Sequence, residues 1–315
     1  MPDILIAGIA VVDAIARPVD RFPEPGGLRF FDDLTISTGG CAVNAAIALS
    51  KLGIPGGCDV VARVGADMLG DFVSSELHRH SLSTRLLARD ARRTTSFSFA
   101  AVGASGERSF LHTTGANAAL CLDDIPLEEV RTRKFLFIAG SMLMDTLDGE
   151  QTAKLLREAR RSGVTTLLDT VYVESAPPLE WQRRIAPALP HLDYFIPSLA
   201  EARALSGLDD PAGAARAFQQ AGARNIAIKL GARGVFLRDQ SGRESTIPAF
   251  PVDRVVDSTG AGDCWAAGFI TGLSTGLEFT GAARLGNAVA ACGIQAPGAT
   301  AGVKPLAEVR GRCGL

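Results

Sequence analysis

The residues best suited to chemistry lie near the C-terminus, where a run of small residues leads into an acid. Gly260, Ala261 and Gly262 directly precede Asp263, and the residues that follow favour a helix. Small residues let a loop bring its backbone close to a ligand, and the unpaired N–H groups at a helix start attract an anion. A carboxylate in the first turn can accept a proton beside that anion. The segment predicts a phosphoryl-transfer site with its own base; a glycine-rich turn before a packed helix is the simpler alternative.

A second group of polar and small residues lies near the N-terminus. Gly39 and Gly40 precede a predicted helix that begins near Asn44. The glycine pair permits close approach of the backbone, and the asparagine amide supplies both a donor and an acceptor. Asp13 follows the first predicted strand, and ligands of open α/β sheets gather at the carboxyl ends of strands. A polyhydroxylated ligand needs this mixture, although a capped turn and a loop acid explain the same residues.

A third segment, from Lys229 through Gly231 to Gly234, joins a predicted strand to an antiparallel pair. It matches neither the P-loop nor the dinucleotide fingerprint. By itself it is also compatible with a simple tight turn.

The elements that must position these residues alternate along most of the chain. Apolar runs alternate with amphipathic stretches, which is the βαβ pattern of a mainly parallel sheet. We therefore expect a three-layer α/β/α sandwich with right-handed crossovers. The predicted strands are 4–9, 59–64, 135–139, 165–169, 194–197 and 225–230, with an antiparallel pair at 234–238 and 244–247. The predicted helices are 44–52, 68–80, 150–161, 199–206, 211–220, 262–274 and 279–295.

Two segments, 14–37 and 94–112, interrupt this alternation. The first is rich in proline and glycine, and residues 96–102 of the second alternate polar and apolar side chains as a half-exposed strand does. Residues 103–106 form a predicted turn. We expect a small antiparallel β lid over a substrate cleft, with a dimerisation flap or an edge decoration as alternatives. Residues 1–13, 38–93 and 113–315 then make up the nucleotide- and substrate-binding core.

Composition limits the range of functions. The net charge of the 315 residues is −2, and no run of Lys or Arg indicates a nucleic-acid or lipid partner. No apolar stretch is long enough to span a bilayer, and the N-terminus lacks the basic region of a signal peptide, so we expect a cytoplasmic protein. The six cysteines contain no C-x-x-C pair and do not cluster with the four histidines, which argues against zinc.

The segments TGGCAVN at 38–44 and DSTGAGDCWAAG at 257–268 resemble the paired motifs of the ribokinase-like (PfkB) carbohydrate kinases. Their order and spacing fit that family across nearly the whole chain. The resemblance implies an ATP-dependent kinase that phosphorylates a primary hydroxyl of a small sugar or sugar acid. Asp263 would be the catalytic base, and the N–H groups of Gly260, Ala261 and Gly262 would stabilise the transferring phosphoryl group.

The resemblance also implies roles for residues outside the base and the anion hole. Homodimers that pair through the lid are common in the family. The implied sugar-binding residues are Asp13, Gly39, Gly40 and Asn44. The implied nucleotide-binding residues are Lys229, Gly231, Gly234 and Asn287. Glu201 would organise Mg²⁺ through water, and Asp257 and Thr259 resemble positions that bind a monovalent cation such as K⁺ in some members.

The chain departs from the family pattern at three positions. Ser198 stands where Asn usually precedes the metal-linked acid, and Val171 stands where the middle strand is often followed by Asp-x-Asn. Both departures bear on metal placement. Cys41 follows the glycine pair where ribose-specific members usually have Lys, which argues against ribose. A nucleoside kinase, a phosphosugar kinase and a catalytically silent binding protein remain alternative functions.

Overall fold

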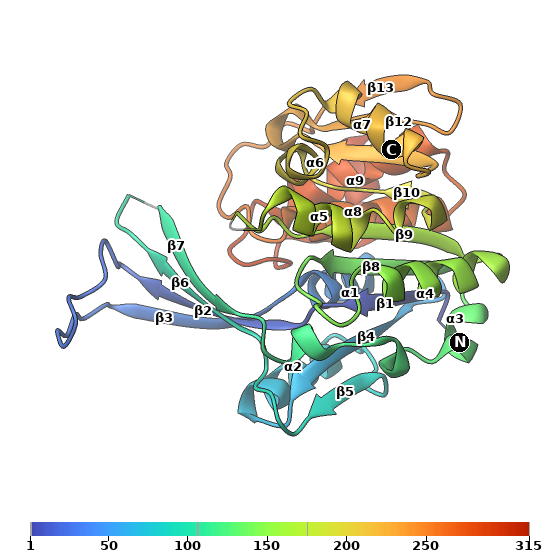
Figure 1. Cartoon of the computed structure of the whole chain (residues 1–315). Coiled ribbons are helices and arrows are strands. Elements are labelled where there is room, and N and C mark those ends of the chain that lie inside the picture. Colours follow the sequence, from blue (N-terminus) through green and yellow to red (C-terminus); the bar gives the residue numbers. More distant parts are fainter. Residues whose placement is uncertain (1, 106, 175, 315) are drawn as a thin grey trace.

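A nine-stranded sheet forms the centre of the molecule, in the order β13-β12-β11-β10-β9-β8-β1-β4-β5 (Figure 1). The computed structural model describes residues 2–105, 107–174 and 176–314. Neighbouring strands from β5 to β11 run parallel, and only β12 and β13 join antiparallel. The strands are β1 Ile4–Gly8, β4 Cys58–Gly65, β5 Leu87–Asp90, β8 Phe135–Ser141, β9 Thr165–Thr170, β10 Tyr194–Phe195, β11 Asn225–Lys229, β12 Val235–Arg238 and β13 Glu244–Ile247.

Helices cover both faces of this sheet, and each face has its own apolar core. One core contains side chains of α1 Cys41–Leu52, α2 Met68–Arg79, α8 Ala261–Ser274, α9 Phe279–Gly293 and α10 Leu306–Cys313. The other contains side chains of α3 Leu127–Arg131, α4 Glu150–Arg161, α5 Pro178–Ile185, α6 Leu199–Ser206 and α7 Pro211–Gln220. Short 3₁₀ turns lie at Gly115–Ala119, Leu122–Asp124, Leu189–His191 and Gly231–Arg233. The predicted three-layer α/β/α sandwich is confirmed.

Helix boundaries follow the local capping signals closely. The predicted helices 150–161, 199–206 and 211–220 have the observed bounds of α4, α6 and α7. Asp210 caps α7 by accepting hydrogen bonds from the N–H groups of Ala212 and Gly213, and proline occupies the first turn. Helices α3, α5 and α10 were absent from the prediction, and the strand predicted at 194–197 is shorter, Tyr194–Phe195.

A separate four-stranded sheet projects from the body as a long arm, seen at the left of Figure 1. Its strands are β2 Val11–Arg17, β3 Asp33–Gly39, β6 Phe97–Val102 and β7 Arg108–Thr113, in the order β3-β2-β6-β7. The two outer pairs are antiparallel and the central pair, β2 with β6, is parallel. These strands fall largely within the segments 14–37 and 94–112 predicted as a lid. Strand β2, however, begins at Val11 and β3 ends at Gly39, so Asp13 belongs to this sheet and not to the core segment 1–13 in which it was predicted. The predicted turn at 103–106 ends on residue 106, which lies outside the described residues.

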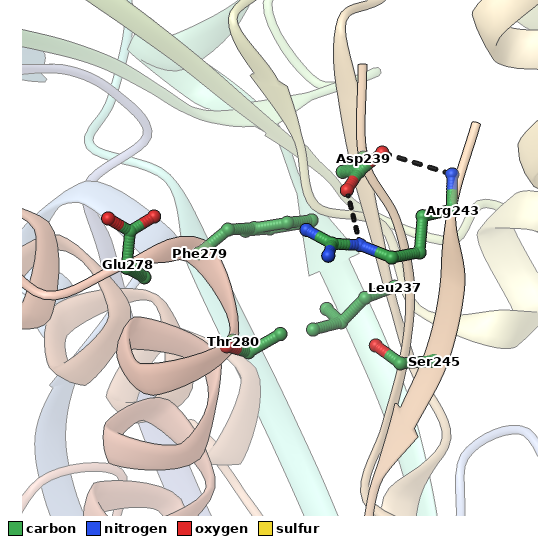
Figure 2. A pocket seen from close by; sticks show the side chains of 7 residues that line it. All are labelled: Leu237, Asp239, Arg243, Ser245, Glu278, Phe279 and Thr280. Atoms are coloured by element: carbon green, nitrogen blue, oxygen red, sulfur yellow. Dashed lines mark hydrogen bonds and ion pairs between the residues drawn. The ribbon is translucent and has the colours of Figure 1, made fainter. Parts of the chain in front are cut away.

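The β12–β13 hairpin forms one edge of the central sheet, and β5 forms the other. Beside this hairpin lies a small cavity of about 180 Å³ (Figure 2). The cavity is lined by Leu237, Asp239, Arg243, Ser245, Glu278, Phe279 and Thr280. Because β12 pairs antiparallel to β11, Asp239 follows the end of β12 that lies beside the start of β11. The cavity therefore lies at the amino ends of the parallel strands, away from the edge where α/β ligands bind.

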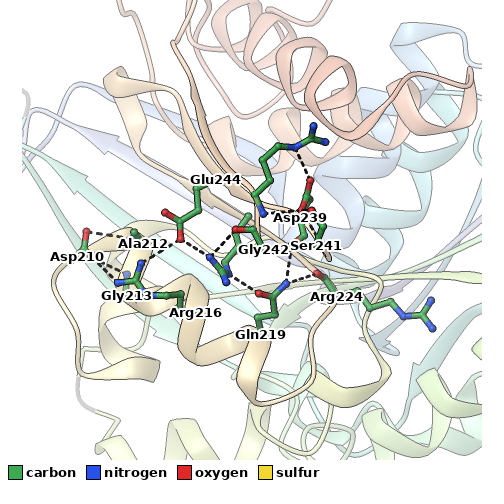
Figure 3. Close-up of polar contacts among 12 residues, drawn as sticks. Asp210, Ala212, Gly213, Arg216, Gln219, Arg224, Asp239, Ser241, Gly242 and Glu244 are labelled. Atoms are coloured by element: carbon green, nitrogen blue, oxygen red, sulfur yellow. Dashed lines mark hydrogen bonds and ion pairs between the residues drawn. The ribbon is translucent and has the colours of Figure 1, made fainter.

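Polar contacts fasten this hairpin to α7 (Figure 3). The guanidinium of Arg238 donates to Gln219 Oε1 at 2.6 Å and to Glu244 Oε1 at 2.6 Å, and Arg216 also reaches Glu244. The Gln219 amide donates to the backbone carbonyl of Asp239 at 2.8 Å. The charged side chains of Arg216, Arg238 and Glu244 therefore hold the hairpin against α7.

Candidate active site

The two sequence motifs meet where α1 and α8 begin. The side-chain amide of Asn44 donates a hydrogen bond to Asp263 Oδ2 at 2.8 Å, across 219 positions of the chain. Both side chains are buried. Helices α1 and α8 pack on the same face of the sheet, so their first turns open toward the same space. Residues predicted separately for sugar binding and for proton transfer are therefore in direct contact.

Glycine is required at the start of each of these helices. Gly40 caps α1 with φ +87°, and a Cβ there would lie 2.6 Å from the carbonyl oxygen of Ile9. Gly260 caps α8 with φ +70°, and a Cβ there would lie 2.5 Å from the Cβ of Ala299. Other residues rarely adopt positive φ. The glycines thus let both helix starts pack closely against neighbouring backbone.

The predicted anion hole is the first turn of α8. The N–H of Ala261 donates to the carbonyl of Ser258 at 3.2 Å, so this donor takes part in the turn itself. Gly262 lies deeper in the first turn, where N–H groups have no acceptor within the helix. A Cβ added to Gly262 would meet only Lys229 Nζ, at 3.4 Å. The side-chain ammonium of Lys229 therefore lies beside the first turn of α8.

Asp263 has the electrostatics of a usable base. Burial raises its pKa to about 6, against the opposing effects of the Asn44 hydrogen bond, the Lys229 charge and the Cys41 side chain. A carboxylate with this pKa is ionised at neutral pH and accepts a proton more readily than an exposed aspartate. The Cys41 side chain also contacts Asp263 through a hydrogen bond. The sequence interpretation treated it only as a departure from ribose-specific members.

The residues predicted to bind the sugar lie against the four-stranded sheet. Asp13 in β2 pairs with Ser98 in β6, and Ser98 pairs with His112 in β7, so the three side chains share one face. Ser98 Oγ lies 2.9 Å from His112 Nδ1. Burial raises the pKa of Asp13, and a hydrogen bond from Ser98 opposes that effect. A Cβ on Gly39 would lie 2.1 Å from Asp13 Oδ2, which places this carboxylate against the glycine pair.

Ser98 and His112 were not among the predicted site residues. The alternation of polar and apolar residues over 96–102 already indicated that Ser98 shares a face with Ser96 and Ala100. Only strand pairing could show that this face also carries Asp13 and His112.

A buried ion pair lies next to Asp263. Lys229, at the end of β11, donates from Nζ to Asp169 Oδ2 at 2.5 Å, and the two side chains are 13% and 4% exposed. Burial alone would lower the pKa of Lys229, but Asp169, Glu201 and Asp263 raise it. The ammonium therefore stays charged. Asp169 was not a predicted site residue, although it precedes the departure at Val171.

Glu201 lies in the first turn of α6, within a capping box. Ser198 Oγ accepts from the N–H of Glu201, and Glu201 Oε2 accepts from the N–H of Ser198 at 2.6 Å. The hydroxyl that replaces the usual Asn amide is thus engaged in capping. Among the described residues, no group of three His, Cys, Asp or Glu side chains is placed to hold a metal. In nucleotide enzymes Mg²⁺ is held largely by phosphates and water, so a single water-linked carboxylate fits such an ion.

Two residues predicted along the nucleotide shape the segment after β13. The Asn287 amide donates to the carbonyls of Ile247 and Pro248 at 3.1 and 2.9 Å, and its oxygen accepts from the Trp265 indole at 2.8 Å. A Cβ on Gly234 would lie 2.0 Å from the Ile247 carbonyl oxygen. Asn287 therefore ties the segment after β13 to α8 and α9, and its side-chain amide is fully engaged by these protein groups. Gly231 starts the adjacent 3₁₀ turn with φ +63°.

The acid predicted to bind a monovalent cation joins two loops. Asp257 Oδ1 accepts from the N–H of Thr259 at 2.9 Å, and Asp257 Oδ2 accepts from the N–H of Gly298 at 3.1 Å. Asp257 is buried. The contact brings the segment before α8 next to the segment after α9.

Within the described ranges, no helix is both long enough and apolar enough to cross a membrane.

A family match over most of the chain identifies the class of protein as a carbohydrate kinase. Residues 1–305 match the pfkB family of carbohydrate kinases, and the chain belongs to that family. It is 29% identical over 287 residues to the 2-dehydro-3-deoxygluconokinase of Bacillus subtilis, covering 87% of this chain and 86% of that protein. An uncharacterized sugar kinase of Escherichia coli, YegV, is 30% identical over 91% of this chain and 87% of its own.

Solved structures agree with the family assignment. The ribokinase of Thermotoga maritima superposes with a TM-score of 0.84 at 25% identity, covering the whole of both chains. The Arabidopsis thaliana ribokinase, solved with ribose and ATP, has a TM-score of 0.87 at 22% identity, over 100% of this chain and 99% of its own. The expected family and fold are confirmed.

Proposed function

We propose that this protein transfers the γ-phosphoryl group of ATP to a primary hydroxyl of a small monosaccharide or sugar acid. The observation that carries the proposal is the hydrogen bond between Asn44 and Asp263. It joins a sugar-binding motif to a base at a helix N-terminus. An ATP-dependent reaction of this kind belongs in the cytoplasm.

In the proposed reaction, Asp13, Gly39, Gly40 and Asn44 hold the sugar with its primary hydroxyl toward Asp263. The hydroxyl oxygen forms a bond to the γ-phosphorus as its proton passes to Asp263. The bond from phosphorus to the β–γ bridging oxygen breaks, and ADP leaves with that oxygen. The N–H groups of Gly260 and Gly262 stabilise charge on the transferring oxygens, which is the main catalytic task in such reactions, while the Ala261 N–H holds the turn through Ser258.

The remaining predicted residues support the nucleotide and its ions. Lys229 and Gly231 border the phosphate end, while Gly234 and Asn287 form the wall beyond β13. Mg²⁺ would neutralise charge on the β- and γ-phosphate oxygens, and Glu201 would orient it through water. Asp257 and Thr259 would hold a K⁺ ion next to the anion hole.

The names of two relatives support one group of substrates as the first to test. The Bacillus subtilis relative is named for a sugar acid, and a Geobacillus kaustophilus relative, 27% identical over 98% of this chain, is a 5-dehydro-2-deoxygluconokinase. Cys41 follows the glycine pair, where ribose-specific members usually have Lys. Deoxy-keto sugars and sugar acids are therefore the first compounds to test.

The decisive experiment is a coupled ADP-release assay over a panel of sugars, with Mg²⁺ and K⁺ present. The panel should include ribose, 2-dehydro-3-deoxygluconate and 5-dehydro-2-deoxygluconate, and mass spectrometry should identify the product. We expect ADP release that depends on one sugar and yields its phosphomonoester. Sugar and nucleotide binding without turnover would refute the proposal in favour of a silent binding protein.

We also propose that the projecting sheet acts as a lid and pairs with the lid of a second copy. Leu34, Ile36 and Leu111 are exposed by 51%, 44% and 60%, and all lie on the face opposite Asp13. Leu111→Glu should reduce the sedimentation coefficient from that of a dimer to that of a monomer. A wild-type protein that sediments as a monomer at micromolar concentration would contradict the pairing.

A further inference from the structure

The ammonium of Lys229 lies beside the first turn of α8. It lies at the carboxyl end of β11, where parallel strands present ligand-binding groups. Gly262 of α8 lies close to it. A Cβ added to Gly262 would lie 3.4 Å from Lys229 Nζ. An anion bound by the first turn of α8 would therefore lie within reach of this ammonium.

Three acids from three different elements surround the ammonium. Asp169 from β9 makes the 2.5 Å ion pair, while Glu201 from α6 and Asp263 from α8 act on Lys229 through their charges. Asp169 Oδ1 accepts from the N–H of Thr170 at 2.9 Å, so both carboxylate oxygens are engaged. Asp169 is thus fixed by its own strand, and it fixes Lys229.

A γ-phosphate arriving beside these carboxylates would be repelled unless a cation met it, because like charges in a partly buried site interact strongly. The side chains at positions 198 and 171 offer little help in meeting this charge. The Ser198 hydroxyl caps α6, and Val171 is an apolar residue packed against the core. Lys229 is the cation already in place.

We infer that Lys229 donates hydrogen bonds to an oxygen of the transferring phosphoryl group, beside the N–H of Gly262, and that Asp169 is the positioning residue that aims it. The inference rests on the proposed function and makes it more specific. Lys229 transfers no proton in this step. It contributes a charge-assisted hydrogen bond that strengthens as negative charge collects on the phosphoryl oxygens.

The test compares the binding of ADP with that of the β,γ-imido analogue of ATP, by calorimetry in EDTA. Only the analogue carries a γ-phosphate. Lys229→Met should lose about tenfold or more of the preference for the analogue, as expected for a lost hydrogen bond to a charged group. Lys229→Arg should retain part of it. Lys134→Met removes a surface ion pair with Asp3 at the amino end of β8 and is the matched control, with an unchanged preference.

A second variant guards against misfolding, because Lys229→Met leaves Asp169 buried without its partner. The double variant Lys229→Met with Asp169→Asn removes both charges and is compared with Asp169→Asn alone, which has already lost one repelling carboxylate. The preference of the double variant should be about tenfold or more below that of Asp169→Asn, because the two proteins differ only at Lys229. Asp169→Glu keeps the charge but displaces the carboxylate that aims Lys229, so it should reduce the preference while leaving ADP affinity within about twofold. An unchanged preference in a folded Lys229→Met protein, or equal preferences in the double variant and Asp169→Asn, overturns the inference. A wild type that shows this preference but phosphorylates no sugar refutes the proposed substrate class instead.

Discussion

The contact between Asn44 and Asp263 makes a quantitative prediction for the pH dependence of catalysis. Asn44→Ala removes a buried hydrogen bond of 2.8 Å to the base and leaves a residue that favours the helix. A hydrogen bond to an ionised group contributes about 1.5–3 kcal/mol. Each pKa unit corresponds to about 1.4 kcal/mol. The pKa of Asp263 should therefore rise by about one to two units from its present value of about 6.

The direction of the change follows from the role proposed for Asp263. As the proposed base, Asp263 must be ionised to accept the proton, so kcat/KM should fall as the pH drops through the pKa of the free enzyme. In the wild type we expect this acid limb near pH 6. In Asn44→Ala it should move to higher pH, because the hydrogen bond that favours the ionised form is gone.

The assay is the pH profile of kcat/KM with the sugar identified by the panel. Asn225→Ala is the matched control, since it also removes a side-chain amide, one that donates to the carbonyl of Asp193 at the amino end of β11. Its acid limb should stay in place. A fall in kcat/KM for Asn44→Ala with an unmoved acid limb would show that Asn44 does not control the ionisation of Asp263.

Two further substitutions test the base and the sugar pocket. Asp263→Asn should reduce kcat by about 10²–10⁴-fold with nucleotide affinity nearly unchanged, and normal turnover would remove Asp263 as the base. Because burial raises its pKa above 3.8, folding disfavours its ionised form, so the same variant should also melt at a higher temperature at pH 7. Gly39→Ala places a Cβ 2.1 Å from Asp13 Oδ2 and should raise the sugar KM about tenfold. Gly311→Ala, with no heavy atom within 4 Å of its added Cβ, is its control; equal KM values for both variants would contradict the assigned position of Asp13.

Local signals in the sequence were sufficient to predict much of the framework. The bounds of α4, α6 and α7 follow from apolar periodicity and from caps such as Ser198 and Asp210, which act within one turn. Helix α5 was missed because it is only eight residues long and buries only Trp181 and Ile185, which is too short a pattern to show helical periodicity. In the lid, alternation over 96–102 indicated a strand, but the parallel pairing of β2 with β6 is a long-range choice.

The sequence by itself determined which residues could form an anion cradle and a base, because glycine at a helix start and an acid in the first turn are local requirements. Tertiary structure alone decided which of these residues touch. The contact of Asn44 with Asp263 and the pairing of Lys229 with Asp169 join segments 219 and 60 positions apart. No local pattern specifies such contacts, because they arise where the ends of parallel strands and two helix N-termini converge on one edge of the sheet. Burial at that edge also raises the pKa of Asp263, since the carboxylate loses water that only the assembled layers exclude.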